Sequence, residues 1–360
     1  MFLKTVMERN QPLVRLGIEW QQNGVILPDT YLLDYDTILE NARSIKQAGD
    51  ANGVQNFFML KQIGRNPLIA RALTDMGYVG AVCVDFREAL TMVENQIPLG
   101  NVGHLVQIPR AALKKILRAK PVIVTVYTLE KAREISAVCT ELGLHQKLML
   151  RVLGEGDMLY SGQYGGFELQ ELDSAVRAIE AMPNVEVGGV CSFPCFLYDE
   201  AAQDILPMPN LRTVQTAAEM LRARGYRDLM LNTPSATCTH SIPMIAAAGG
   251  THGEPGHGLT GTTPYHAGHP DAEERPGYLY VSEVSHNLGD KAYCYGGGHY
   301  RRGHMKNALV GTTPENAKVV PVLPPDDSSI DYHFELQQNC PVSAAAVMAF
   351  RTQFFVTRSR

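Results

Sequence analysis

The sequence has no long apolar run and no strongly basic segment. Within its 360 residues, no stretch approaches the roughly 18 consecutive apolar residues that a membrane span needs. The first residues, MFLKTVMERNQPLVRLG, lack the apolar core of a secretory signal, so we expect a cytoplasmic protein without a membrane partner. The formal net charge is -5 and no basic stripe appears, which argues against nucleic acid as a partner.

Cysteine is sparse and dispersed. The seven cysteines are Cys83, Cys139, Cys191, Cys195, Cys238, Cys294 and Cys340. Their odd number, wide spacing and mostly apolar surroundings predict reduced thiols rather than a disulfide framework. The pair Cys191 and Cys195 is one residue too wide for a redox motif, and no second pair stands near it to complete a zinc site.

Internal repeats and low-complexity segments are also absent, and what the sequence has instead is a strand–helix alternation. A strand at 30–35 precedes a helix for which Asp36 is the expected N-cap. From residue 54, short apolar strands alternate with helical stretches. The clear strands are at 54–60, 78–84, 101–108, 121–126, 147–153, 185–193 and 228–233, and a weaker eighth is expected around 256–259. Strands of this kind are typical of a parallel sheet covered by helices.

The number of these units favours a closed barrel. Eight βα units in about 210 residues match a TIM (β/α)8 barrel in size, with an open doubly wound sheet as the alternative. After about residue 265 the helical periodicity fades, and strand-like runs between Gly, Pro and Asp residues predict a mostly β domain. We assign residues 28–265 to the barrel, and 1–27 plus 266–360 to the β domain. The chain stops inside or just after the strand-like AAVMAFRTQFFV, so a closing strand beyond residue 360 is conceivable.

Lys61 is the first candidate for chemistry. It ends the apolar stretch FFMLK, at the carboxyl end of the first predicted barrel strand. Catalytic residues of TIM barrels lie at these strand ends. An ordinary exposed lysine is the simpler interpretation. However, a lysine at the mouth of an apolar cavity has a lowered pKa, which covalent chemistry with a carbonyl group requires.

Two further strand ends are typical of a phosphate site. LNTPSATCTHS (231–241) follows the seventh strand, and GEPGHG (253–258) belongs to the eighth. A phosphate site built from the loops after these two strands recurs in TIM barrels. The alternative is that Gly, Ser and Thr merely form turns. The nearby His252, His257, His266 and His269 are more typical of a glycine-rich loop than of a metal site, and we expect no metal.

Together these residues resemble the alanine-racemase-like proteins, which are fold-type III enzymes dependent on pyridoxal 5'-phosphate (PLP). TYLLDYDTILENARSI followed by FFMLK looks like the family's opening, and GAVCVDFREAL is similar to its second strand and helix. This similarity covers roughly residues 28–265. KQIGRNP, GHLVQIP, EPGHGLTGTTP, YCYGGGHY and AFRTQFFVTRS resemble the YhfX-type subgroup and extend the similarity to the C-terminus.

The resemblance implies a role for each candidate residue. Lys61 would bind PLP covalently. Ser235, Ala236 and Thr237, with the backbone of Gly256 and His257, would hold the phosphate. Arg65 stands where alanine racemases have a phosphate-binding tyrosine, and Gln163 aligns loosely with an arginine that contacts the phenolate oxygen. Glu254 departs from the racemase pattern: its strand reads Glu-Pro-Gly rather than Arg-Pro-Gly, as in the related basic amino-acid decarboxylases.

Glu254 therefore bears on the reaction. A carboxylate beside the ring nitrogen favours the pyridinium, which is a stronger electron sink for a carbanion at Cα. Racemisation needs a second acid or base, which in the family comes from the C-terminal domain of a partner subunit, and this implies a homodimer with shared sites. Cys294, Tyr295, His299 and Tyr300 are candidates, with Cys294 preferred, although it is equally well read as a buried strand residue.

Several activities stay open at this point. We rank an amino-acid racemase or epimerase first and a decarboxylase second, since the Asp-Gly motif expected after the decarboxylase cysteine reads Tyr295-Gly296. A lyase acting at Cα–Cβ or by β-elimination, some relatives of which use zinc, is third. A non-catalytic PLP carrier and a barrel that binds a sugar phosphate are the remaining alternatives. The amino-acid substrate itself is not identified.

Overall fold

The computed structural model describes residues 2–296, 300, 302–326, 328–330 and 332–354. The chain divides into two compact units. The barrel unit comprises Ala42–Leu60 and Arg65–Gly256. The β unit comprises Met1–Asn41, Lys61–Gly64 and His257–Arg360. Among the described residues, no helix has both the length and the apolar character needed to cross a membrane.

The barrel unit is a parallel sheet that closes on itself. Its strand segments follow the order β2-β13-β12-β9-β7-β6-β5-β4-β3. Their bounds are β2 Gln55–Asn56, β3 Phe58–Met59, β4 Ala81–Cys83, β5 Leu99–Val102, β6 Ile123–Val126, β7 Gln146–Leu153, β9 Val185–Cys191, β12 Met230–Asn232 and β13 His252–Gly253. The first and last segments of this order, β2 and β3, are consecutive in the chain and are separated only by Phe57.

Hydrogen bonds made by β2 and β3, the first pass of the chain through the sheet, close the ring of strands. The Phe57 N–H donates to the Gly253 carbonyl (3.0 Å), and the Phe58 N–H donates to the Gly80 carbonyl on the other side (3.0 Å). Because β2 and β3 form one pass, the nine segments correspond to eight passes, as in a TIM barrel. The predicted barrel with a C-terminal β domain is confirmed.

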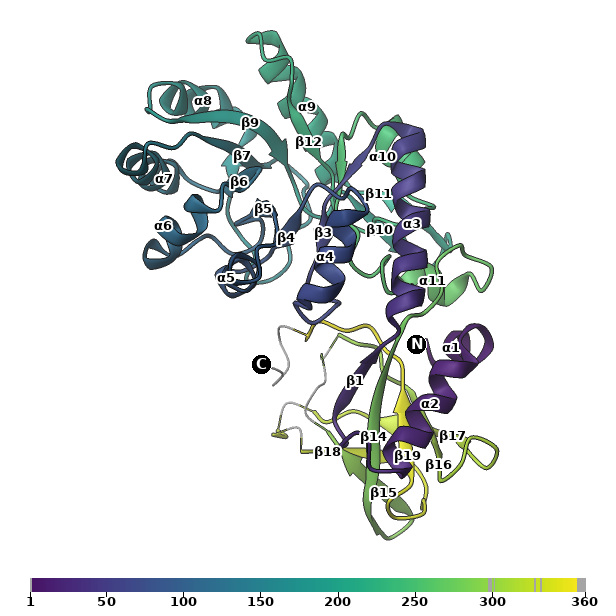
Figure 1. Cartoon of the computed structure of the whole chain (residues 1–360). Helices are drawn as coiled ribbons and strands as arrows, with labels where there is room; N and C mark the ends of the chain where they lie inside the picture. The colour runs from purple at the N-terminus through teal and green to yellow at the C-terminus, as the bar shows by residue number, and fades with distance from the viewer. Residues whose placement is uncertain (1, 297–299, 301, 327, 331, 355–360) are drawn as a thin grey trace. The chain divides into compact units, whose positions relative to one another are not determined.

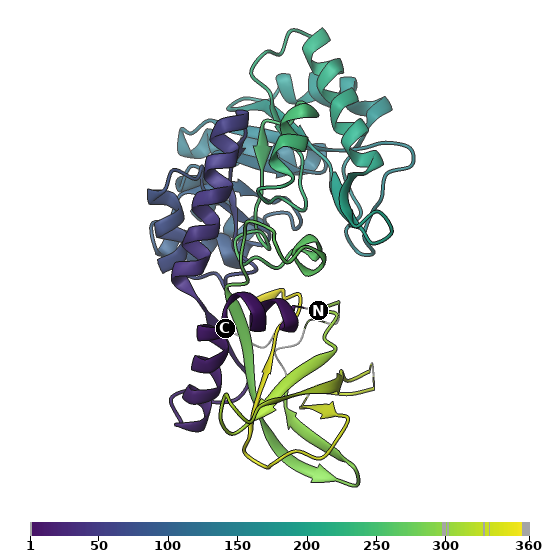
Figure 2. The ribbon, with the colours of Figure 1, turned by 90° about the vertical axis from the view of Figure 1, so that its right-hand side faces the viewer.

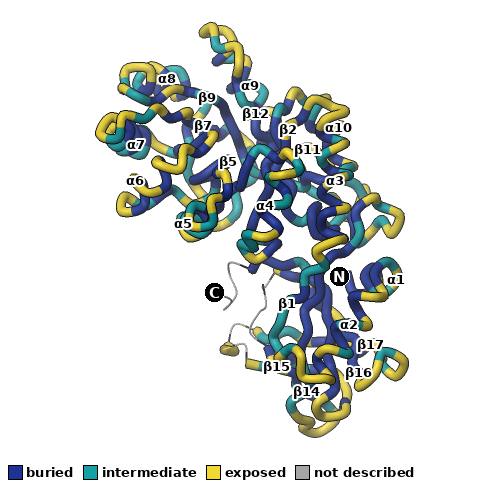
Figure 3. The backbone as a smooth tube through the Cα atoms, viewed as in Figure 1, coloured by how far each residue is buried: buried dark blue, intermediate teal, exposed yellow. Residues whose placement is uncertain are grey.

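Helices surround this sheet (Figure 1). They are α3 Tyr35–Asn52, α4 Pro67–Asp75, α5 Phe86–Glu94, α6 Arg110–Arg118, α7 Leu129–Leu142, α8 Leu172–Glu180, α9 Pro209–Ala223 and α10 Ile242–Ala247. The short pieces β8 (Phe167–Glu168), η1 (Leu169–Glu171), and the hairpin of β10 (Phe196–Asp199) and β11 (Asp204–Pro207) lie in the loops. Buried apolar residues fill the interior: Phe57, Met59, Val82, Val84, Ile123, Met149 and Cys191. In Figure 3 the strands are mostly buried, whereas the outer sides of the helices are exposed.

Two predicted strands and one helix cap were misplaced. The eighth strand is His252–Gly253, and the predicted stretch 256–259 is a turn. The third strand ends at Val102 rather than at residue 108, so the backbone from Gly103 onward belongs to the loop. Helix α3 begins at Tyr35, and its first turn is capped by Asp34, whose side chain accepts from the Thr37 N–H (3.1 Å); the prediction of Asp36 as N-cap was wrong.

The β unit is an antiparallel barrel. Strands β14 (Tyr278–Leu288), β15 (Lys291–Tyr295), β18 (His333–Leu336), β17 (Lys318–Leu323), β16 (Asn307–Gly311) and β19 (Ala345–Met348) pair in that order, and β19 pairs back with β14. Strand β1 (Thr30–Leu33) adds to β14 at its side. Figure 2 shows the long strand β14 passing through this unit.

Alternate side chains of β14 pack into two separate hydrophobic cores. Tyr280 and Val284 point into the closed barrel, where they pack with Cys294, Phe334 and Phe350. Leu279 and Val281 point outward and pack under the N-terminal helices α1 (Leu3–Arg9) and α2 (Gln11–Gln22). This two-residue alternation is the periodicity of a strand covered on both faces. The N-terminal segment thus lies in the β unit, where it forms helices. The remaining helix of this unit is α11 (Pro264–Gly268).

Candidate active site

Glu254 is the centre of a buried polar cluster in the barrel unit. It directly follows β13, and its side chain is fully buried. Asn232, the last residue of β12, donates from Nδ2 to Glu254 Oε1 (2.6 Å), and Asn101 of β5 donates to the same oxygen (3.2 Å). The other oxygen, Oε2, has no hydrogen-bond partner among the described residues. Glu254 is thus fixed at one oxygen and can accept a donor at the other.

The orientation of this cluster is set by a second layer of contacts. Thr125 of β6 donates from its hydroxyl to Asn101 Oδ1 (2.7 Å), so the amide group of Asn101 is turned with its nitrogen toward Glu254. His104, which follows β5, lies with Nε2 3.6 Å from Glu254 Oε2. A buried carboxylate is costly unless it is hydrogen-bonded, and the two amides reduce this cost.

The loop after β12 carries Ser235, Ala236 and Thr237. The Glu254 N–H donates to Thr237 Oγ1 (3.2 Å), which joins this loop to the eighth strand. Ser235 donates from its hydroxyl to the Phe196 carbonyl (2.7 Å). Ala236 has φ +55°, which residues with a side chain rarely adopt. The Ser241 hydroxyl donates to the Ala236 carbonyl (2.9 Å). Such a held, unfavourable backbone is common at binding sites.

Gln163 lies beside a buried arginine. Arg151 of β7 is only 1% exposed. It donates to the Gln163 carbonyl (2.9 Å) and to the Tyr127 hydroxyl (2.9 Å). Tyr127 in turn donates to the His104 carbonyl (2.6 Å). The side-chain oxygen of Gln163 is buried and has no hydrogen-bond partner among the described residues. Arg151 therefore fixes the loop on which Gln163 lies.

Arg65 contacts a carboxylate of its own unit. Its Nε lies 3.9 Å from Oε1 of Glu88, whose side chain is fully buried. Glu88 also accepts from the Val84 N–H through Oε2 (2.8 Å), which fixes it at the start of α5. Arg65 has φ +56°. The ion pair holds Arg65 near the carboxyl end of β4.

Lys61 and His257 belong to the β unit. Lys61 lies two residues beyond β3 in the chain, in a turn, and it is half-buried. His257 follows Gly256, and its ring contacts Gln62, the neighbour of Lys61, at 3.3 Å. Burial, together with the positive charges of Arg351 and Lys61, holds the pKa of His257 well below its ordinary value.

Cys294 lies in the apolar core of the antiparallel barrel, in β15, and it is fully buried. Burial raises the pKa of its thiol to about 12. A residue enclosed by its own β barrel packs against that core, and this location argues against the acid–base role predicted for Cys294. Of the other candidates, Tyr295 is partly exposed and Tyr300 is half-buried, while His299 lies outside the described residues.

The remaining cysteines and histidines have ordinary surroundings. All seven cysteines are free and buried. His252 contacts Thr251 (2.8 Å), and His266 contacts Glu274 (3.0 Å). His269 stacks on Tyr265 (3.9 Å between ring centroids). Among the described residues, no group of three or more His, Cys, Asp or Glu side chains is arranged to hold a metal ion.

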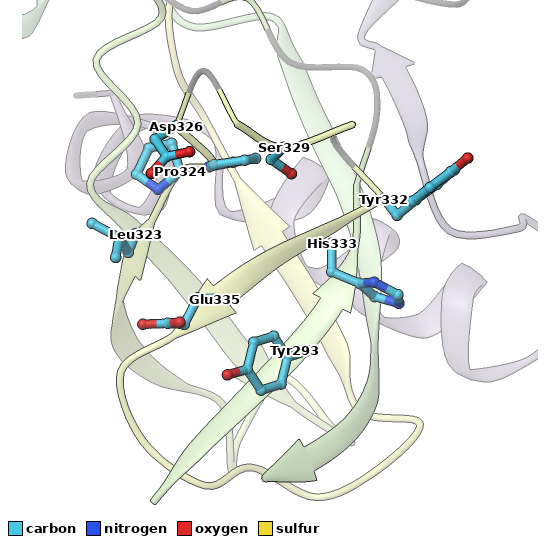
Figure 4. A pocket seen from close by; sticks show the side chains of 9 residues that line it. Tyr293, Leu323, Pro324, Asp326, Ser329, Tyr332, His333 and Glu335 are labelled. Carbon is cyan, nitrogen blue, oxygen red and sulfur yellow. The ribbon is translucent and has the colours of Figure 1, made fainter.

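A hollow of about 580 Å³ opens on the β unit (Figure 4). Tyr293, His333 and Glu335 of β15 and β18 line it, and the other lining residues are Leu323, Pro324, Pro325, Asp326, Ser329 and Tyr332. Its carboxylate Glu335 already pairs with Lys291 (2.6 Å). None of the described residues predicted to bind the cofactor lines this hollow.

Comparison with known families agrees with the fold. The family model "Alanine racemase, N-terminal domain" matches residues 33–264. The chain belongs to the alanine-racemase-like family. A second model, "YhfX-like, C-terminal domain", matches residues 279–360. The chain is also 43% identical to the Escherichia coli K12 protein named "Uncharacterized protein YhfX", over all of this chain and 93% of that protein. The predicted resemblance to the family and to its YhfX-type subgroup is confirmed.

Solved structures of other alanine-racemase-like proteins share the fold. D-threonine aldolase from Filomicrobium marinum is 17% identical, with a TM-score of 0.66 over 91% of this chain and 87% of that one. Alanine racemase from Clostridium difficile 630 is 14% identical, with a TM-score of 0.62 over 90% and 87%. D-threo-3-hydroxyaspartate dehydratase from Delftia sp. HT23 is 15% identical, with a TM-score of 0.64 over 90% of each chain. At these identities the likeness concerns the fold alone.

Four residues of the candidate site in this alanine-racemase-like chain were not found from the sequence: Asn101, His104, Arg151 and Asn232. Asn101, Arg151 and Asn232 lie within short, otherwise apolar strands, in LGNV, LMLRVL and MLN. A polar residue inside a buried strand is a usable signal, because its side chain must find a partner. His104 lay inside the predicted strand 101–108, but the strand ends at Val102, so His104 stands in the loop that follows it.

Proposed function

We propose that this protein is a PLP-dependent enzyme that labilises a bond at Cα of an amino acid, most simply as an amino-acid racemase or epimerase. In this proposal Lys61 carries the cofactor. Ser235, Ala236 and Thr237, together with the backbone of Gly256 and His257, hold the phosphate. Arg65 assists at the phosphate, Gln163 lies near the phenolate oxygen, and Glu254 faces the ring nitrogen. Membership of the alanine-racemase-like family supports these assignments.

The observation that carries the proposal is the second oxygen of Glu254. It is buried and has no hydrogen-bond partner in the described part of the chain, while the first oxygen accepts from Asn101 and Asn232. The ring nitrogen of PLP, when protonated, is an N–H donor that this oxygen would accept. The chemistry of the residues present therefore fits the cofactor. A buried pair of Glu254 with His104 alone is the simpler alternative.

The residues would divide the work as follows. Bound PLP supplies an electron sink for negative charge that develops at Cα. Glu254, fixed by two amides, keeps a negative charge beside the ring nitrogen and so favours its protonated form. The amine of Lys61 would serve as general base and acid for the proton at Cα. Burial of Glu254 and its amide partners excludes water from this end of the site.

Fewer observations bear on which reaction the protein catalyses. Glu254 stands at a position that the resemblance links to decarboxylases, so a decarboxylase is the second candidate. The shared fold with an aldolase and a dehydratase keeps a lyase as the third. The residue that would complete a two-base racemase is unassigned, because Cys294 is enclosed in the β barrel. The substrate class is a free amino acid in each case.

The test is to incubate the full chain, loaded with PLP, with panels of L- and D-amino acids in D2O and to follow Cα by NMR. A racemase gives deuterium exchange with interconversion of the two enantiomers. Loss of the carboxylate would favour a decarboxylase, and cleavage or dehydration a lyase. Absence of all of these across both panels would contradict an enzyme and favour a non-catalytic PLP carrier.

A further inference from the structure

The C-terminal motif AFRTQFFVTRS has no role in the proposed function so far, yet its described part contacts the segment that carries Lys61. Both segments belong to the β unit. The Phe354 N–H donates to the Lys61 carbonyl (2.9 Å). The neighbouring Thr352 offers its carbonyl to Nε2 of His257 (3.1 Å). Thr352, Gln353 and Phe354 are all buried.

His257 connects these two segments through both ring nitrogens. Nε2 lies at the Thr352 carbonyl, which can only accept, so Nε2 carries the proton. Nδ1 then accepts from the amide nitrogen of Gln62 (3.3 Å). The neutral ring therefore joins Gln62, next to Lys61, to the C-terminal segment. This tautomer follows from the partners, and burial keeps the ring uncharged.

The C-terminal segment is also held by packing of the Phe354 side chain. The ring of Phe354 meets Tyr31 of β1 edge to face, with centroids 4.2 Å apart. A carbon placed at the Cβ position of Gly64 would lie 3.8 Å from the same ring. Gly64 has φ +65°, a conformation that glycine adopts without cost. The turn 61–64 is therefore held at its start by the peptide of Phe354.

We propose that Gln62, His257, Thr352 and Phe354 form a strap that positions Lys61 for its covalent bond to the cofactor. His257 and Phe354 act as positioning residues, because Phe354 binds the carbonyl of Lys61 and His257 contacts the side chain of Gln62, the residue that follows it. The strap gives His257 a side-chain role in addition to the backbone role at the phosphate. The proposal rests on Lys61 being the cofactor lysine, but the strap itself exists without the cofactor.

The experiment compares His257→Leu, His257→Gln and Phe354→Ala in the full chain. Amide hydrogen exchange, without PLP, is measured on peptides covering residues 60–66 and on a peptide from α7. The strap predicts faster exchange in 60–66 for His257→Leu and Phe354→Ala, with no change in α7. His257→Gln restores protection, because its amide can both donate to Thr352 and accept from Gln62.

The matched control is His266→Leu. His266 is also buried in the β unit, but it contacts Thr263 and Glu274 rather than the Lys61 turn. We expect this variant to lose thermal stability while exchange in 60–66 stays as in the wild type. Equal exchange in 60–66 for His257→Leu and the wild type would overturn the strap, as would the same increase in His266→Leu.

The second readout is spectroscopic. PLP is added to each variant, and the rate at which the long-wavelength absorption of the lysine-bound cofactor appears is recorded. The strap predicts a slower appearance, by about tenfold or more, in His257→Leu and Phe354→Ala, and recovery in His257→Gln. If the wild type shows no such band, the proposed function fails, and the exchange data still decide the strap. A normal rate in His257→Leu would overturn the positioning role.

Discussion

At the scale of single residues, Glu254 carries the most specific chemistry. Its hydrogen bonds from Asn101 and Asn232 leave one oxygen for a donor outside the described chain. We predict that Glu254→Gln, which keeps the size but removes the charge, slows Cα exchange by about 100-fold or more, because the charge beside the ring nitrogen is lost. The rate is measured by NMR in D2O with PLP-saturated protein. An unchanged rate would contradict a role for the carboxylate.

The amide partners give a second prediction, which concerns stability. Asn101→Leu removes a donor to a buried carboxylate and should lower the free energy of unfolding by about 1.5–3 kcal/mol. The loss should be smaller in the Glu254→Gln background, because the oxygen is then uncharged. Chemical denaturation of the four proteins measures this coupling. Asn210→Leu is the control, since Asn210 is equally buried but contacts Met158 and Ser192; here the two losses should add.

Cys294 gives a prediction at alkaline pH. Its thiol has an ordinary pKa of 9.0, which burial raises to about 12 in the folded protein. Above pH 9 the unfolded chain loses this proton first, so the stabilisation is present below pH 9 and is lost as the pH rises toward 12. We expect the difference in unfolding free energy between wild type and Cys294→Ala to shrink from pH 8 to pH 10.5. A constant difference across this range would contradict the buried thiol.

Single residues were predictable where they stand at strand ends. Lys61 could be chosen because it follows an apolar stretch in a TIM-like pattern, and Glu254 because of the family resemblance. Asn101 and Asn232 could not be paired with Glu254, because 153 and 22 residues of chain separate them and only the closed sheet brings β5 and β12 to β13. The resemblance made Cys294 the preferred second acid or base, but the barrel that closes around it could not be predicted from the sequence.

At the scale of elements, several strands of the barrel are shorter than the stretches predicted for them, for example β4 and β12. β13 is only His252–Gly253, and burial lowers the pKa of His252 to about 4. His252 stacks on Phe57 of the first pass (5.2 Å between ring centroids). The eighth strand is held by its neighbours on both sides rather than by its own strand propensity, so the sequence placed it wrongly.

His252 leads to a prediction in acid. Below pH 6.5 the unfolded chain takes up a proton that the folded ring takes up only near pH 4. The contribution of the uncharged His252 ring to the unfolding free energy is fully present above pH 6.5 and is lost as the pH falls through about 4. We expect His252→Gln to show a shallower loss of unfolding free energy over this window, by up to about 1.4 kcal/mol per pH unit. An unchanged slope would show that the ring is not excluded from water.

The start of helix α3 is another element boundary that the sequence alone placed wrongly. Asp34 and Asp36 are both good capping residues, and the sequence pattern led us to choose Asp36. Asp34 is selected because it also accepts from Asn10 (2.8 Å), a contact across 24 residues that only the folded β unit provides.

At the scale of the whole molecule, the two architectures could be predicted but the closure of the second could not. The alternation of strands and helices indicates a TIM barrel, since few other folds use eight such units. The strand-like runs after residue 265 do not show how many strands form the C-terminal barrel. The pairing of β19 with β14 that closes this barrel joins residues about 65 positions apart. Membership of the alanine-racemase-like family supports both units.

The homodimer is a prediction at this scale. Because racemases of the family complete each site with a residue from the partner, we expect a mass of about twice 39.6 kDa in solution. Light scattering coupled to size-exclusion chromatography measures it, and dilution should reduce activity per chain together with the mass. A monomer that retains full activity would contradict shared sites.

The most direct test of the account is the identity of the residue that carries the cofactor. The PLP-loaded full chain is reduced with borohydride, digested and analysed by mass spectrometry. We predict a single pyridoxyl group on Lys61, and no labelling of the Lys61→Ala protein. Absence of the label, or its presence on another lysine, would contradict the account.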